Sequence, residues 1–339
     1  MMKEKLANLE GWRGLLSLVV CVSHSFQLLA PQYLWKYSWM RIWGTLSHFS
    51  VLAFFFISGI VIFHSLKIRF NNNESSFSHY FRSRFLRIYP PLIGAIIVLF
   101  ILRFLVFSFN IQSIKPYFDF SNFDLVNGLL MIKLSLGNVN APLWSLALEW
   151  WFYFIGYILL FGVKTKNYLI KIILLFSLAL TYSFLLNINT NLYLFLLVWL
   201  MGGGYYILIN YFYQKKIFVY VCILLGMYLI FWENILFQQE DFNHQTLNQI
   251  ISVIAFSGLW NYLPKINFLL FLSRSSYSLY IIHYPLLLFI LGISRMLNLD
   301  LHVVLILSII LIIGISHMYA RVFENKKYFE KIIFRQSSN

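Results

Sequence analysis

The sequence predicts an all-α integral membrane protein, a bundle of about ten transmembrane helices with both termini in the cytoplasm. Of its 339 residues, 60% are hydrophobic and only 11% are charged, whereas soluble domains carry about 25% charged residues. Apolar runs long enough to cross a bilayer recur along the whole chain, and the basic residues gather in alternate loops. These three observations exclude a water-soluble globule.

The predicted helices are apolar windows bounded by polar or charged residues, and they form one domain that covers residues 1–339. Two polar intervals interrupt them. Residues 66–89 are basic, and residues 111–141 form a candidate segment that dips back into the membrane. The predicted spans are 12–30, 45–65, 90–110, 142–163, 168–187, 192–212, 217–235, 248–263, 276–294 and 301–323.

The net charge of +14 arises from 26 lysines and arginines against 12 acidic residues. With ten spans both termini share one face, and most of the basic residues fall on that face. Basic loops stay in the cytoplasm, so the termini are expected there. Anionic lipid headgroups, and not nucleic acid, are the expected counter-surface. The two cysteines lie in apolar runs, and no metal-binding motif is present, so neither a disulfide framework nor a metal site is expected.

Arg13 and His24 are the informative polar residues of the first predicted span, because charged groups at membrane depth persist mainly where they face a cavity or a partner. Eleven residues separate them, so they share a helix face about 16 Å apart. An arginine at the cytoplasmic rim and an imidazole deeper inside suit a long anionic donor such as coenzyme A. The alternative is that Arg13 reaches lipid headgroups and His24 bonds a neighbouring helix.

Three further arginines, Arg82, Arg84 and Arg87, precede the third predicted span, which is expected to begin at Pro90 and Pro91. They would place more guanidinium groups at the cytoplasmic rim. The alternative is that they only set the topology of the chain.

Glu149 is the only acid well inside a predicted span, at a depth close to that of His24. Ser145 and Tyr153 share its helix face, and Trp144 precedes them. A carboxylate at this depth could orient the imidazole or bind hydroxyl groups of an acceptor. The alternative is a structural glutamate that joins two helices.

Two other segments carry polar groups. In the ninth span Ser276, Tyr280 and His283 share a face, and structural hydrogen bonding is favoured for His283. In the second span Ser58 and Gly59 permit either close helix packing or passage of a slender substrate.

Together these segments resemble the acyltransferase 3 family of integral-membrane acyltransferases. The resemblance rests on five segments in the family's order, which span nearly the whole chain: LEGWRG with His24, FFFISG, RSRFLRIYP, PLWSLALEWWFY and SYSLYIIHYPL. It departs from the family where Glu10 replaces an aspartate and Leu52 replaces a frequent acid. An acid partner for His24 must therefore come from elsewhere, and Glu149 is the candidate.

The resemblance implies transfer of a small acyl group from acyl-CoA, with acetyl-CoA as the expected donor, to a hydroxyl of a carbohydrate or lipid-linked glycan. It assigns His24 as the essential histidine, Arg13 as its paired arginine, and Arg84 and Arg87 as a rim motif. Ser58 is expected near the donor, Glu149 in catalysis, and Trp144, Ser145 and Tyr153 near the acceptor. The acceptor could be an O-antigen, capsule or exopolysaccharide unit, at a bacterial inner membrane.

Several alternatives stay open at this point. His24 could act as a general base, or it could carry the acyl group as an acyl-histidine. Ten spans with buried polar groups also describe a transporter or flippase, and a scaffold that recruits glycan enzymes would bind no coenzyme A. A homo-oligomer is neither required nor excluded.

Overall fold

The computed structural model describes residues 2–36, 42–72, 76–132, 137–164, 166–170, 172–174, 176–177, 192–212, 224, 251–253, 255–256 and 267–334. This part of the chain is helical and contains no strand. Its elements are α1 (Met2–Leu29), α2 (Pro31–Lys36), α3 (Ile42–Asn71), α4 (Phe77–Ser108), η2 (Lys115–Phe118), α5 (Asn122–Leu129), η3 (Gly137–Leu143), α6 (Trp144–Lys164), α8 (Leu192–Phe212), α11 (Asn267–Ser273), α12 (Ser276–Met296), α13 (Leu301–Phe323) and α14 (Lys326–Ile333).

The helices confirm an all-α membrane protein. Within the described ranges, five are long and apolar enough to cross a bilayer: Leu9–Leu29, Ile42–Asn71, Phe77–Ser108, Ser276–Met296 and Leu301–Ile333. Helices α6 and α8 coincide with two more predicted spans. The spans at 168–187, 217–235 and 248–263 fall mostly outside the described residues, so the total of ten and the side of the termini stay predictions.

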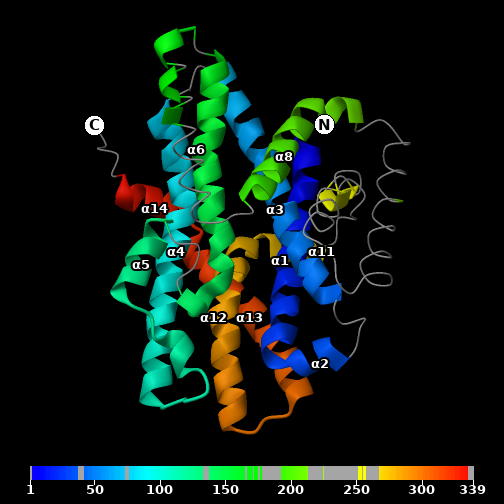
Figure 1. Cartoon of the computed structure of the whole chain (residues 1–339), viewed down its shortest axis with the longest axis vertical. Helices are drawn as coiled ribbons and strands as arrows, with labels where there is room; N and C mark the ends of the chain where they lie inside the picture. The colour runs from blue at the N-terminus through cyan, green and yellow to red at the C-terminus, as the bar shows by residue number, and fades with distance from the viewer. Residues whose placement is uncertain are drawn as a thin grey trace.

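The bundle is centred on α1 and α12. Helix α1 packs against α3, α11, α12 and α13, and α12 also contacts α4 and η3. In Figure 1 the long helices run lengthwise through the molecule, and α14 crosses beside α4. The polar residues of α1, α3, α4, α6 and α12 therefore come together inside the bundle.

The third predicted span begins earlier than expected. Helix α4 starts at Phe77, and Pro90 and Pro91 lie inside it and not at its start. Proline is tolerated in a membrane helix where neighbouring groups satisfy the backbone. The hydroxyl groups of Tyr277 and Tyr319 donate to two carbonyl oxygens near the prolines, those of Ile88 and Pro91, and so join α4, which continues through both prolines, to α12 and α13. As a result the arginines that precede the prolines lie on a continuous helix and not in a loop.

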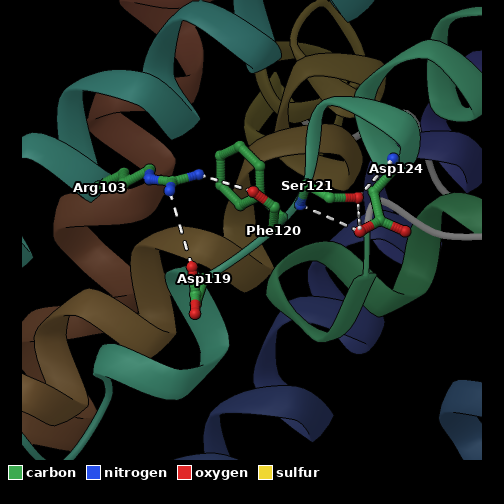
Figure 2. A network of polar contacts seen from close by, with 5 residues as sticks. All are labelled: Arg103, Asp119, Phe120, Ser121 and Asp124. Atoms are coloured by element: carbon green, nitrogen blue, oxygen red, sulfur yellow. Dashed lines mark hydrogen bonds and ion pairs between the residues drawn. The ribbon is translucent and has the colours of Figure 1, made fainter.

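The segment after α4 packs back against the bundle, and whether it enters the membrane stays a prediction. Arg103 of α4 donates to the carbonyl oxygen of Phe120 (2.7 Å) and lies 3.7 Å from the carboxylate of Asp119. Figure 2 shows this network beside the capping box of α5, in which Ser121 and Asp124 bond each other's backbone. Trp151, on the second turn of α6, donates to the carbonyl oxygen of Met131 (2.9 Å). These bonds fix η2 and α5 against α4 and α6.

Helices α3 and α8 cross at two glycines. A Cβ atom on Gly59 would collide with the carbonyl oxygen of Trp199, and one on Gly202 would collide with that of Phe56. Such close backbone approach is typical of small residues at membrane helix interfaces. Of the two expectations for Gly59, close helix packing is the one that applies.

Replacing Gly59 or Gly202 by alanine is therefore expected to lower the free energy of unfolding by about 1–3 kcal/mol, because one backbone must move away from the other. Gly204→Ala is the matched control on the same helix, since no atom of the described residues lies within 4 Å of the position of its Cβ. Alanine favours helix there, so this variant should be slightly more stable than the wild type. Thermal unfolding in detergent measures the difference, and equal losses in all three variants would contradict the close crossing.

Candidate functional site

A cavity of about 60 Å³ lies between α1, α3, α4, α6 and α12. Its wall combines apolar side chains with an unusual number of polar and charged ones. Among the residues that line it, the polar ones are Arg13, Ser58, Arg84, Arg87, Ser145, Glu149, Tyr153, Ser276, Tyr277 and Tyr280. Seven of the nine residues predicted to form the site, on four different helices, therefore meet at one place.

Three guanidinium groups converge on this cavity. Arg84 is only 7% exposed, and its guanidinium lies over the rings of Tyr80 (5.4 Å) and Tyr153 (5.5 Å). The buried Nε of Arg84 has no hydrogen-bond partner among the described residues. Arg13 and Arg87 interact electrostatically with the carboxylates of Glu149 and Glu324. An unpartnered buried guanidinium nitrogen is a donor prepared for an anionic ligand.

Helix geometry separates Arg82 from this group. Arg84 and Arg87 are three residues apart and share a face of α4, whereas Arg82 points to α14. There it forms an ion pair with Glu330 (3.2 Å) and lies 4.3 Å from the ring centre of Phe334. All three arginines lie in one basic segment of the sequence, but only Arg84 and Arg87 line the cavity.

Glu149 bonds to two neighbours inside the cavity. Its Oε1 accepts hydrogen bonds from the hydroxyl groups of Tyr153 (2.6 Å) and Ser58 (3.1 Å). The expectation that Glu149 orients His24 is wrong for this structure, because helical depth alone does not determine which side chains face each other. Glu149 faces the arginines and α3.

The hydrogen-bond partner of His24 is His283 of α12. The Nδ1 atom of His24 lies 2.8 Å from the Nε2 atom of His283. His283 is fully buried, and its Nδ1 atom lies 2.8 Å from the carbonyl oxygen of Tyr280 and 3.1 Å from that of Leu279. His24 itself is half-buried. The imidazole predicted from α1 thus belongs to a pair of imidazoles between α1 and α12.

Tyr280 lies between the cavity and this histidine pair. It lines the cavity, and its ring centre is 5.9 Å from that of His283. Its hydroxyl group hydrogen-bonds to Ser145 (2.6 Å) and donates to the carbonyl oxygen of Pro142 (3.1 Å). Neither His24 nor His283 lines the cavity among the residues described around it. The cavity therefore does not extend to His24 in this structure, and Tyr280 is the lining residue that contacts the histidine pair, through His283.

Trp144, predicted near the acceptor, packs elsewhere. Its ring lies 5.0 Å from that of Phe195 and 6.5 Å from that of Phe55. It is partly buried against the hydrophobic core and does not line the described cavity. Ser145, which follows it, does line the cavity, because adjacent helical residues point about 100° apart.

Three features of the site were not predicted. Tyr277 lines the cavity, and Glu324 accepts hydrogen bonds from the backbone N–H (3.0 Å) and the hydroxyl (2.5 Å) of Ser278. The pairing of His24 with His283 was also not expected. One signal was available for that pair: both histidines lie near the middle of an apolar run, where an unpaired polar group is costly.

The fold and this cavity define a helical membrane protein with a basic and polar interior site next to two histidines. The family model described as "Acyltransferase domain" matches residues 6–320, and the chain belongs to this acyltransferase 3 family. The recognition made from the five sequence segments is thereby confirmed.

No curated protein and no solved structure matches the chain. The family supports an acyltransferase in a multipass membrane protein. Within the described ranges, no group of three or more His, Cys, Asp or Glu side chains could hold a metal ion.

Proposed function

We propose that the protein is a membrane-bound O-acyltransferase that moves an acyl group, with acetyl as the expected one, from cytoplasmic acyl-CoA to a hydroxyl of a cell-surface or lipid-linked carbohydrate. The observation that carries the proposal is the gathering of Arg13, Arg84 and Arg87 in one cavity that ends one ring away from the pair of His24 and His283. Family membership supplies the type of reaction. A bacterial inner membrane is the proposed location.

The three arginines form the proposed donor site. Coenzyme A carries phosphate groups, and guanidinium groups bind phosphate through paired, charge-assisted hydrogen bonds. The unpartnered Nε of Arg84 supports this assignment. Ser58 lies on the same cavity wall and is proposed to contact the donor.

His24 acts as the general base in the proposed reaction. It takes the proton from the acceptor hydroxyl while the hydroxyl oxygen attacks the thioester carbonyl carbon. The new C–O bond forms, the C–S bond breaks, and the thiolate of coenzyme A leaves with the proton that His24 returns. This role is worth about 10²- to 10⁴-fold in rate. Tyr280 lines the cavity and contacts His283, so its ring is proposed to turn aside for the thioester to reach His24.

The acceptor is proposed to meet the donor beside α6. Ser145 and Tyr153 present hydroxyl groups to the cavity. Trp144 is proposed to contact the sugar outside this cavity, which would require its neighbour Phe195 to move. O-antigen, capsule and exopolysaccharide units all present suitable hydroxyl groups. The bilayer is the protein's remaining partner.

A direct test uses the purified protein in detergent with radiolabelled acetyl-CoA and a lipid-linked glycan acceptor. Transfer of label is the expected result. Mass spectrometry of surface polysaccharide from a deletion strain should show the loss of one acyl mass. An unchanged polysaccharide, together with absent transfer in vitro, would refute the proposal.

Replacement of Glu149 by glutamine is expected to lower kcat at least tenfold without raising KM for acyl-CoA. The carboxylate lies among the arginines, so removing its charge cannot weaken their attraction for phosphate, whereas an acceptor hydroxyl loses a charged partner. Tyr153→Phe, which removes one donor to the same carboxylate, is the milder companion variant. Steady-state kinetics with varied acyl-CoA measures both constants, and a raised KM alone would contradict an acceptor role.

Movement of a glycan or lipid intermediate across the membrane is the alternative function. The polar groups of the sequence do not fall into the two matching halves that many transporters show. Transfer of label by the purified protein distinguishes the two functions, because a transporter or a scaffold forms no covalent product.

A further inference from the structure

The contacts of His24 and His283 determine which atoms of the two rings carry protons. The Nδ1 atom of His283 lies within hydrogen-bond distance of two carbonyl oxygens, those of Tyr280 and Leu279. A carbonyl oxygen only accepts hydrogen bonds, so this Nδ1 must carry a hydrogen. In a neutral ring, the Nε2 atom of His283 is then an acceptor.

His283 is expected to be neutral. Its side chain is fully buried, and its described contacts are two carbonyl oxygens, the ring of His24, and the rings of Tyr280 and Tyr284. None of these groups is a carboxylate. A positive charge at this depth would lack the partner that intramembrane charges require.

The contact with His283 determines in turn which nitrogen of His24 carries a hydrogen. Its Nδ1 atom lies 2.8 Å from the accepting Nε2 of His283, so Nδ1 must donate. The two rings lie 8° from parallel, and their nitrogen atoms are closer than their centroids, which are 5.1 Å apart. The imidazoles therefore meet edge to edge, as an N–H···N hydrogen bond requires. The hydrogen bond leaves the Nε2 lone pair of His24 as its basic site.

We infer that His283 is a positioning residue that holds His24 in the tautomer protonated at Nδ1, so that Nε2 of His24 is the atom that receives the acceptor proton. The ring of Tyr284 meets that of His24 edge to face at 5.5 Å and supports its orientation from the same helix. This inference rests on the proposed function for its catalytic part, but the tautomer can be measured without any turnover. The partner of His24 is therefore not the carboxylate expected from the sequence. It is the neutral ring of His283, which in turn donates to backbone carbonyl oxygens.

The first test is ¹⁵N NMR of the full-length protein labelled at histidine, in detergent or nanodiscs. Loss of one set of signals in His24→Gln, and of another in His283→Gln, assigns the two rings. In the wild type both rings should carry the proton on Nδ1 and a lone pair on Nε2. A proton on Nε2 of His24 would overturn the inference, whether or not acyl transfer is ever observed.

The second test compares two substitutions at position 283. Glutamine can place an accepting oxygen near the position of Nε2, whereas methionine fills similar space without a strong acceptor. His283→Met is expected to lower kcat about 10- to 1,000-fold at unchanged KM for acyl-CoA, less than the ~10⁴-fold cost of losing the tautomer in a serine protease triad. His283→Gln should recover at least tenfold of that loss and keep the Nδ1–H signal of His24.

The outcomes separate this inference from the function on which it rests. If the wild type transfers no acyl group, the proposed function fails, and the NMR result alone decides the tautomer. If the wild type is active and both variants retain native thermal stability but show equal kcat, His283 has no positioning role. A purely structural role would lower stability in both variants and would not restore kcat selectively in the glutamine variant.

Discussion

Replacement of His24 by alanine is expected to lower kcat for acyl transfer about 10²- to 10⁴-fold. The imidazole is the only proposed acceptor for the hydroxyl proton, and its hydrogen bond to His283 gives it a fixed orientation. Binding of acyl-CoA should be unaffected, because the arginines that hold the phosphates line the cavity on the other side of Tyr280. Transfer of radiolabel under single-turnover conditions measures the chemical step directly.

The matched control is His64→Gln. His64 is another histidine on a membrane helix, and its Nδ1 lies 3.2 Å from the hydroxyl of Tyr206, between α3 and α8. It does not line the described cavity, so activity should stay near the wild-type value. His24→Ala and His64→Gln should both keep the thermal unfolding midpoint within a few degrees. An active His24→Ala protein would remove His24 from the mechanism.

Replacing Arg84 and Arg87 together by alanine is expected to weaken acyl-CoA binding about 100-fold. Each charge-assisted hydrogen bond to phosphate contributes about 1.5 kcal/mol or more, and 1.4 kcal/mol is a factor of ten in affinity. The remaining affinity should also vary less with ionic strength, because fewer charges attract the ligand. Isothermal titration at low and high salt, with a non-hydrolysable acyl-CoA analogue, measures both effects.

Arg82→Ala is the control on the same helix. Its guanidinium pairs with Glu330 on α14 and does not line the cavity, although it lies in the same basic segment of the sequence. Removing it lowers the net charge by one but should change acyl-CoA affinity less than threefold. If Arg82→Ala weakened binding as much as the double variant, general attraction by the basic rim would replace a specific phosphate site.

Much of the fold could be predicted from the sequence because apolar runs and their polar boundaries are local features. The runs at 192–212, 276–294 and 301–323 end within two residues of α8, α12 and α13. The start of α4 could not be predicted in this way. Proline has a strong local preference for helix starts, but α4 continues through Pro90 and Pro91, where tyrosines from α12 and α13 bond to it from neighbouring helices.

The members of the site could largely be predicted, but their pairings could not. Arg13 and Glu149 carry charges that are costly at membrane depth, so their chemistry alone marked them, whereas Arg84 was marked by the basic segment that precedes the third predicted span. Which side chain faces which depends on the rotation and crossing of separate helices. Glu149 and His283 both lay at a suitable depth for His24, and only the contact of α1 with α12 decided in favour of His283.

The glycine crossing of α3 and α8 also has a consequence for how substrates gain access. With backbone against backbone at Gly59 and Gly202, these two helices cannot slide or rotate past each other without separating. Ser58, beside this crossing, therefore belongs to a stationary wall. Opening of the interior would then have to come from the facing helices, and movement of Tyr280 would break its two hydrogen bonds to Ser145 and Pro142.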